Sequence, residues 1–169
     1  LLWFPHLQGR VLPPQPHARG AWVGLTAGHT HGHLFRALLE GIAYEYALWA
    51  ELATAGGGHG ALTEARALGG GAASRLWNQI KADVLGIRWV PARRQECGVL
   101  GDALIAAAAT GHVTDLAATA KQWQSTAEPV EPDPARTAVY ARLRDAYTSL
   151  GANLAPIMNL LHDATTDRS

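Results

Sequence analysis

One stretch of the sequence decides the fold, residues 64–91, which reads EARALGGGAASRLWNQIKADVLGIRWVP. Residues 64–68 have the character of a short strand, and three glycines then turn the chain. Ser74 is placed to act as the N-cap of a helix over residues 75–85, and Gly86 is placed to end it. A second short strand, closed by a proline, follows at once. The stretch therefore predicts a strand–turn–helix–strand unit.

The flanking segments extend this alternation in both directions. Residues 87–90 form the second strand, and the small, apolar residues 98–110 predict another helix. Upstream, residues 21–25 predict a strand, and apolar side chains recur at helical spacing through residues 30–54. The prolines and glycines of residues 1–20 indicate an extended loop. The pattern predicts an α/β fold with helices on a mixed or parallel sheet. So few strands indicate a piece of a larger domain.

Finer features of the chain follow from composition and spacing. The glycines of residues 56–60 are expected to end the long helix and form a flexible connection. On the helix over residues 75–85, an apolar face is predicted from Leu76, Ile80 and Val84, with Leu85 beside it.

The chain divides into three parts by composition. Residues 1–127 are predicted to form the domain, and the proline-rich residues 128–134 an extended linker. An amphipathic helix is predicted over residues 135–153, within a C-terminal part that covers residues 135–169. The last residues, 163–169, have the composition of a disordered tail.

Composition excludes some classes of partner. The 169 residues carry a formal net charge of zero, which gives no electrostatic case for nucleic acid or an anionic membrane. No apolar run approaches the roughly 20 residues of a membrane span. The single cysteine, Cys97, favours a reducing compartment and thus a cytoplasmic protein. The large apolar residues at the start, Leu1 to Pro5, indicate a chain that begins within a domain.

The glycine turn is the main candidate for a ligand site. Glycine lets the backbone approach a ligand closely, and the following helix presents unpaired N–H groups to an anion. The arrangement therefore suits a nucleotide phosphate, although a simple flexible turn has the same composition. It is neither a Walker loop nor a Rossmann fingerprint, because the spacing differs and no Lys-Ser/Thr pair follows.

Three blocks of sequence together resemble the FGGY family of carbohydrate kinases, and in particular its xylulokinase branch. The first is residues 69–86, with the glycine triplet, Ala, Ser, Leu-Trp, Gln and Ala-Asp in the family's order. The second, residues 20–40, is similar to the family's C-terminal signature. The third, residues 96–111, is similar to its alanine-rich helix, with Asp102 where relatives often have alanine. The resemblance covers about residues 1–111.

The resemblance implies a partial ribonuclease H-like (actin-like ATPase) domain with an appended C-terminal helix. It implies an ATP-dependent kinase for a pentulose, D-xylulose first, with Mg²⁺ held mainly by groups outside this chain. The cofactor-binding residues carried over are Gly69, Gly70, Gly71, Ala72 and Arg75. Arg75 stands where some relatives have Asn, and could stack on adenine or reach phosphate. The catalytic Asp of the family belongs to a first domain that is not in this chain.

Other side chains have simpler interpretations than a site. Three histidines near the start of the long helix suggest a metal, but two at most share a helix face, so capping is expected: His29, His31 and His33. Three acids on that helix are expected on a solvated face: Glu40, Glu45 and Glu51. Five tryptophans are expected to fill the core and interfaces: Trp22, Trp49, Trp77, Trp89 and Trp123. Cys97 is expected to be a buried, inert thiol.

A second class of function stays open beside the kinase. The chain could be a non-catalytic fragment or an assembly module. In a fragment, strands 21–25 and 64–68 would lack the strands that normally pair beside them. Their unpaired edges favour self-association or contact with the missing N-terminal domain.

Overall fold

The computed structural model describes residues 1–55, 60–93 and 96–166 of the chain. Its elements follow in the order β1 (Leu2–Phe4), β2 (Ala21–Val23), α1 (His31–Ala55), β3 (Glu64–Ala67), the 3-10 turn η1 (Gly70–Ala73), α2 (Arg75–Leu85), β4 (Arg88–Pro91), α3 (Cys97–Ala109), α4 (Leu116–Trp123) and α5 (Pro134–Thr166). The predicted glycine connection after α1 lies outside the described residues, apart from Gly60.

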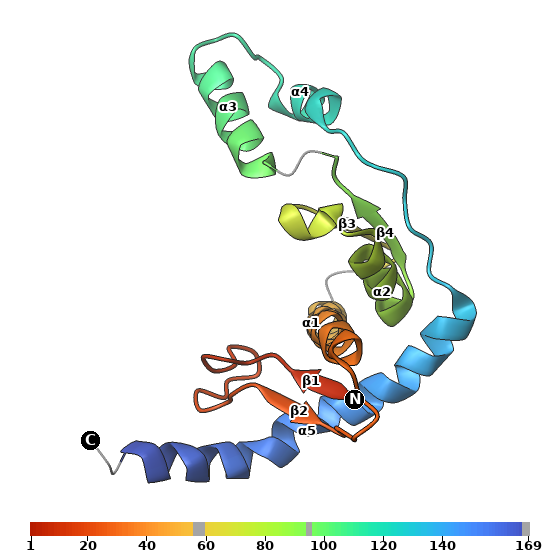
Figure 1. The fold of residues 1–169 in the computed structure, drawn as a ribbon. Coiled ribbons are helices and arrows are strands. Elements are labelled where there is room, and N and C mark those ends of the chain that lie inside the picture. The colour runs from red at the N-terminus through yellow and green to blue at the C-terminus, as the bar shows by residue number, and fades with distance from the viewer. Residues whose placement is uncertain (56–59, 94–95, 167–169) are drawn as a thin grey trace.

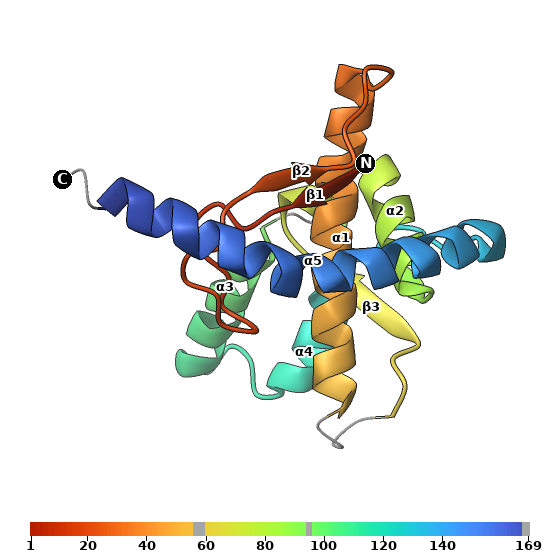
Figure 2. The same cartoon turned by 90° about the horizontal axis from the view of Figure 1, so that it is seen from below.

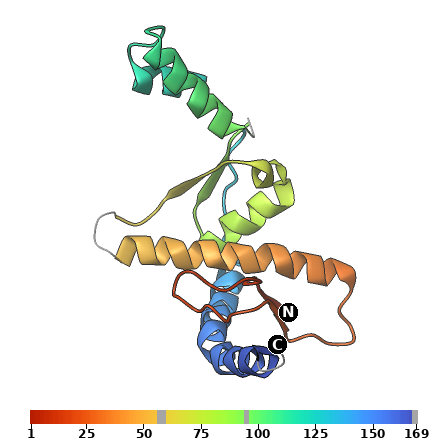
Figure 3. The same cartoon turned by 90° about the vertical axis from the view of Figure 1, so that its left-hand side faces the viewer.

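The long helix α1 lies in the middle of the molecule, between two small sheets (Figures 1 and 3). On one side, β3 and β4 pair in parallel, with α2 as the crossover between them. On the other side, β1 and β2 pair antiparallel, and α5 crosses α1, as the view from below shows (Figure 2). Helices α3 and α4 extend beyond β3 and β4, away from α1. The predicted α/β fold is confirmed.

Helix α2 forms where the sequence predicts it. The Ser74 side chain accepts a hydrogen bond from the Trp77 N–H at 3.3 Å, and Gly86 ends the helix in the left-handed region. Ile80 and Val84 are buried as expected. Leu76 is not, because half of its surface is exposed. Residues four apart on a helix differ in direction by about 40°, so Leu76, eight residues before Val84, points away from the buried face.

The prediction that Glu45 is solvated is wrong. Glu45 is 3% exposed and accepts hydrogen bonds from Arg10 at 3.0 Å and from the Tyr147 hydroxyl at 2.7 Å. His6 lies 3.1 Å from the same carboxylate. Burial raises the pKa of Glu45, but the neighbouring His6, the hydrogen bond from Tyr147 and the charge of Arg10 outweigh it, so the net pKa is lowered. These four residues, the Glu45 cluster, join the N-terminal loop, α1 and α5.

The N-terminal segment contains a strand that the sequence did not predict. β1 lies within the expected loop and packs against α1. The close approach of β1 to α1 requires a glycine at position 41 of the helix, because a Cβ there would overlap the backbone oxygen of Trp3. A three-residue strand has too little periodicity to reveal itself among prolines.

The C-terminal part also differs from expectation. Helix α4 is additional, with the Asp115 side chain accepting from the Ala118 N–H at its start. Helix α5 continues to Thr166, well past the predicted end at residue 153, so the expected disorder of residues 163–166 is wrong. The segment before α5 is extended, and Val130 exchanges two backbone hydrogen bonds with Trp89 of β4. The division into domain, linker and tail stays a prediction.

Two apolar clusters lie on the two sides of α1. The larger joins β1, α1, α2 and α5 through Phe4, Ala18, Ala43, Tyr44, Ala47, Ile80, Val84, Tyr140 and Tyr147. The smaller lies under β3 and β4 and consists of Ala67, Ala72, Ala82 and Trp89. None of the helices in the described ranges combines the length and the apolar character needed to cross a membrane.

Candidate functional site

The glycine turn lies at the carboxyl end of β3, immediately before α2. Gly69 has a φ of 79° and a ψ of −177°, a conformation that side chains with a Cβ rarely adopt. Residues 70–73 form the short 3-10 turn, which the Ala72 N–H closes by donating to the Gly69 carbonyl at 3.0 Å. In α/β sheets, ligands bind outside the carboxyl ends of parallel strands. The turn therefore occupies the edge at which such sheets bind ligands.

The five predicted cofactor-binding residues are contiguous but differ in accessibility. Gly70 is exposed, and a Cβ placed on Gly69 or Gly70 would have no described neighbour within 4 Å. Ala72 is buried, 7% exposed, and its carbonyl accepts from the Asn78 side-chain amide at 2.7 Å. Arg75 is exposed on the first turn of α2. A ligand can thus approach Gly69, Gly70 and Arg75 directly, whereas Ala72 is turned inward.

Gly71 is held against the indole of Trp77. A Cβ on Gly71 would lie 2.8 Å from the Trp77 Cζ3 atom, well inside van der Waals contact. The indole is itself fixed, because its N–H donates to the Leu39 carbonyl of α1 at 3.1 Å. Only glycine at position 71 allows the turn to rest this closely on α2.

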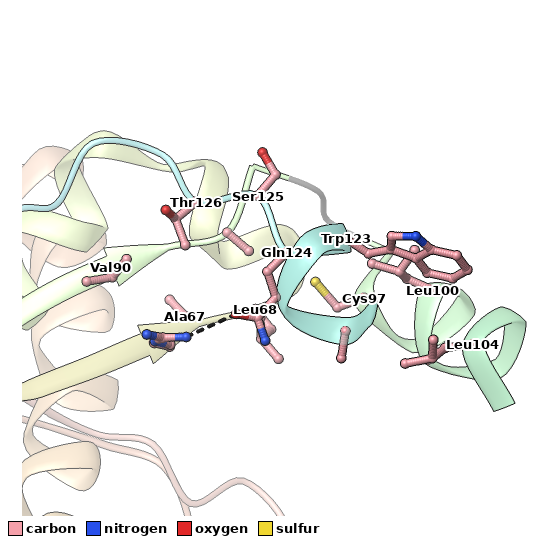
Figure 4. A pocket seen from close by; sticks show the side chains of 14 residues that line it. Ala67, Leu68, Val90, Cys97, Leu100, Leu104, Trp123, Gln124, Ser125 and Thr126 are labelled. Atoms are coloured by element: carbon pink, nitrogen blue, oxygen red, sulfur yellow. Dashed lines mark hydrogen bonds between the residues drawn. The ribbon is translucent and has the colours of Figure 1, made fainter. Parts of the chain in front are cut away.

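A cavity of about 320 Å³ lies beside the turn, between the carboxyl ends of β3 and β4 and the helices α3 and α4 (Figure 4). Its described lining is mostly apolar and comprises Arg66, Ala67, Leu68, Val90, Ala92, Cys97, Leu100, Gly101, Leu104, Ala120, Trp123, Gln124, Ser125 and Thr126. The five predicted residues are not among them, since the lining stops at Leu68, next to Gly69. The site therefore has two adjoining parts, the glycine turn and the apolar pocket.

Sequence reasoning missed the pocket. Trp123 was expected to be a filler, yet it lines the pocket from α4, beside Leu100 and Leu104 of α3 (Figure 4). Cys97, at the start of α3, lines it too and is partly exposed rather than fully buried. The usable signal was Asp115, a typical N-cap residue that marks the start of α4. The meeting of α3, α4 and the strand ends has no local signature.

The polar groups at the pocket are few. Arg66 donates to the Gln124 side chain at 3.2 Å and to Glu64 at the same distance. An apolar cleft with a few polar groups at its edge suits a flat heteroaromatic ring.

The histidines at the start of α1 take part in turns. The Nδ1 atom of His29 accepts from the Thr26 N–H at 2.9 Å, and that of His33 accepts from the Thr30 N–H at 3.1 Å. Both contacts are of the capping kind expected from the sequence. Within the described residues, no group of three or more His, Cys, Asp or Glu side chains is placed to hold a metal ion.

Comparisons with known proteins identify the class of protein that this fold and site define. The family model described as "FGGY family of carbohydrate kinases, C-terminal domain" matches residues 1–110. A xylulose kinase from Rhodospirillum rubrum superimposes with a TM-score of 0.78 and 34% identity, covering 94% of this chain and 31% of that one. A gluconate kinase from Lactobacillus acidophilus superimposes with a TM-score of 0.77 and 27% sequence identity, covering 92% of this chain and 31% of that one. A glycerol kinase from Bordetella parapertussis is 40% identical over 133 residues, 78% of this chain and 26% of that protein.

The chain belongs to the FGGY family of carbohydrate kinases, as its sequence resemblance predicted. Its fold is that of the family's C-terminal domains, which are actin-like (ribonuclease H-like). It spans about a quarter of the length of the curated relatives that it matches.

Proposed function

We propose that this chain is the nucleotide-side part of an ATP-dependent kinase that phosphorylates a sugar or polyol hydroxyl. The observation that carries the proposal is the glycine turn at the carboxyl end of β3, within a segment that matches the family's C-terminal domain. Gly69 and Gly70 present backbone without a Cβ to the ATP phosphates, and the exposed Arg75, the first residue of α2, adds a positive charge next to the turn. The apolar pocket offers a place for the adenine ring.

The remainder of the reaction is proposed to belong to groups outside this chain. Phosphoryl transfer needs a base at the acceptor hydroxyl and Mg²⁺ across the phosphates. The resemblance assigns the base to an Asp of the family's first domain, and the metal mainly to groups outside residues 1–169. We therefore expect the isolated chain to bind nucleotide without transferring phosphate. The lone cysteine and the need for ATP favour a cytoplasmic location.

Two acceptor substrates have support. D-Xylulose is favoured by the resemblance of residues 69–86 to the xylulokinase branch and by the R. rubrum xylulose kinase. Glycerol is favoured by curated glycerol kinases that are 40% to 43% identical. Kinetics of the complete enzyme that contains this chain, with D-xylulose, glycerol and gluconate in parallel, would decide between them.

Binding of ATP to the isolated chain is the direct test. Calorimetric titration with MgATP should give saturable binding. Gly70→Asp should weaken it by more than about tenfold, because it puts a carboxylate beside the phosphates. Gly70→Ala is the matched control, since a Cβ there meets no described atom within 4 Å. Equal affinities for the wild type and Gly70→Asp would contradict a phosphate site at the turn.

The alternative function is a non-catalytic fragment or assembly module. The two-stranded sheets, and helix α3, in which no residue is buried, favour contact with another chain or with the remainder of such a kinase. Light scattering tests self-association, and a coupled ADP-release assay tests catalysis. Turnover that depends on D-xylulose or glycerol would contradict the expected inactivity of the isolated chain.

A further inference from the structure

Lys81 is buried within an aromatic cage. It is 3% exposed, and its ammonium nitrogen lies 3.6 Å from the ring centroid of Trp77, 5.2 Å from that of Trp89 and 5.5 Å from that of Tyr46. Lysine is seldom buried unless paired, and no carboxylate forms an ion pair with Lys81 in the described parts of the chain. The ring faces are thus the groups that stabilise its charge.

One of the rings that hold the ammonium, Trp77, touches the glycine turn, and a second, Trp89, is linked to it through Asn78. The Trp77 indole lies under Gly71, within the distance at which a Cβ would collide. The Trp89 N–H donates to the Asn78 side chain at 3.2 Å, and Asn78 in turn donates to the Ala72 carbonyl at 2.7 Å. Two short chains of contacts therefore run from Lys81 to adjacent residues of the turn.

The third ring anchors the cage to the rest of the molecule. Tyr46 belongs to α1 and stacks near Trp89 of β4, with 6.2 Å between ring centroids and 24° between planes. The cage thus joins α1, α2 and β4 directly behind the strand edge that carries the turn. Burial lowers the pKa of Lys81 to about 8, so the ammonium is still the main form at pH 7.

We propose that Lys81 is a positioning residue for the nucleotide site: its ammonium fixes the indoles of Trp77 and Trp89, and these hold the glycine turn in its ligand-binding conformation. The inference rests on the proposed function, because the turn must bind the nucleotide for its position to matter. Lys81 itself makes no contact with the nucleotide in this arrangement. Its charge acts through the two rings.

The first test measures the affinity for MgATP of three variants of the chain. Lys81→Met keeps the length and apolar stem but loses the charge, and should raise the Kd roughly threefold to thirtyfold. Lys81→Arg retains a cation that stacks on aromatic rings, and should stay within about threefold of the wild type. Arg142→Met removes an exposed cation on α5, away from the turn and the pocket, and should change nothing.

The second test does not depend on a variant that folds. The sequence contains two lysines, Lys81 and Lys121, so lysine labelled with ¹³C gives one caged and one exposed probe. The Lys81 side-chain protons should be shifted upfield by the ring currents, and should shift again when MgATP is added. The Lys121 signals give the reference for an exposed lysine without the upfield shift.

The outcomes separate the two proposals. Absence of ATP binding by the wild type would overturn both the phosphate site and the role of Lys81. Binding that is equally tight in Lys81→Met, or a Lys81 resonance that ignores bound ATP, would overturn the Lys81 inference alone. A loss of affinity in Lys81→Met that Lys81→Arg does not restore would also overturn it, since packing rather than charge would then hold the turn.

Discussion

Replacing Gly71 with alanine tests how the glycine turn is held. The new Cβ would lie 2.8 Å from Trp77 Cζ3 and 3.3 Å from Cε3. Carbon atoms in contact prefer about 3.5 Å or more, so the indole or the turn must give way by roughly 0.7 Å. The indole is tied to Leu39 by its N–H and faces the Lys81 ammonium at 3.6 Å. The Trp77 indole therefore cannot move away without losing these contacts.

The expected cost is that of overpacking a well-filled site, about 1–3 kcal/mol. For a chain of this size, each kcal/mol lowers the melting temperature by about 2–4 °C. Calorimetry on Gly71→Ala should therefore show a decrease in melting temperature of about 2–12 °C. The affinity for nucleotide should fall as well, because the displaced turn is the proposed phosphate site.

Two neighbouring glycines supply matched controls. Gly70→Ala meets no described atom within 4 Å and needs no left-handed backbone, so its melting temperature should be unchanged or slightly raised. Gly69→Ala has equal space but a φ of 79°, so strain alone should cost about 1–3 kcal/mol. Equal melting temperatures for Gly71→Ala and Gly70→Ala would refute the contact between the turn and Trp77.

Three further substitutions probe the packing around α1 and the start of α2. Gly41→Ala places a Cβ against the backbone oxygen of Trp3 and should lower the free energy of unfolding by about 3 kcal/mol or more, measured by urea denaturation. A urea midpoint equal to that of the wild type would show that β1 does not pack on α1. Within the Glu45 cluster, Glu45 has a lowered pKa in the folded state, so its carboxylate stabilises the fold above the unfolded value of about 4.5 and loses that contribution as the pH falls. Glu45→Gln should lower the free energy of unfolding by about 3–5 kcal/mol at pH 7. It should also flatten the acid side of a plot of melting temperature against pH, and an unchanged acid side would contradict the role of the Glu45 cluster. Ser74→Ala should cost about 1 kcal/mol by removing the acceptor for the Trp77 N–H, with Ser74→Thr as the control that keeps a cap.

Local features of the sequence predicted the centre of the fold. Ser74 and Gly86 marked both ends of α2, because capping and left-handed termination depend on residue type at single positions. The glycines after β3 marked the turn for the same reason. The family could also be recognised from the sequence, since its motifs are contiguous blocks. The assignment of Gly69, Gly70, Gly71, Ala72 and Arg75 to the nucleotide stays a prediction.

Contacts between distant segments could not be predicted in this way. Glu45 had the type and spacing of a solvated acid, and only the approach of the N-terminal loop and α5 buries it beside Arg10 and Tyr147. The pocket is formed where α3 and α4 fold over the ends of β3 and β4.

The sequence by itself determined where the strands and helices around the glycine turn begin and end, and the family to which the chain belongs. Only the tertiary structure decided that Lys81, Trp77 and Trp89 meet behind the turn. The physical reason is that caps and turns are set by interactions among residues a few positions apart. Burial of a charge among rings depends instead on how α1, α2 and β4 pack, which no short stretch of the chain specifies.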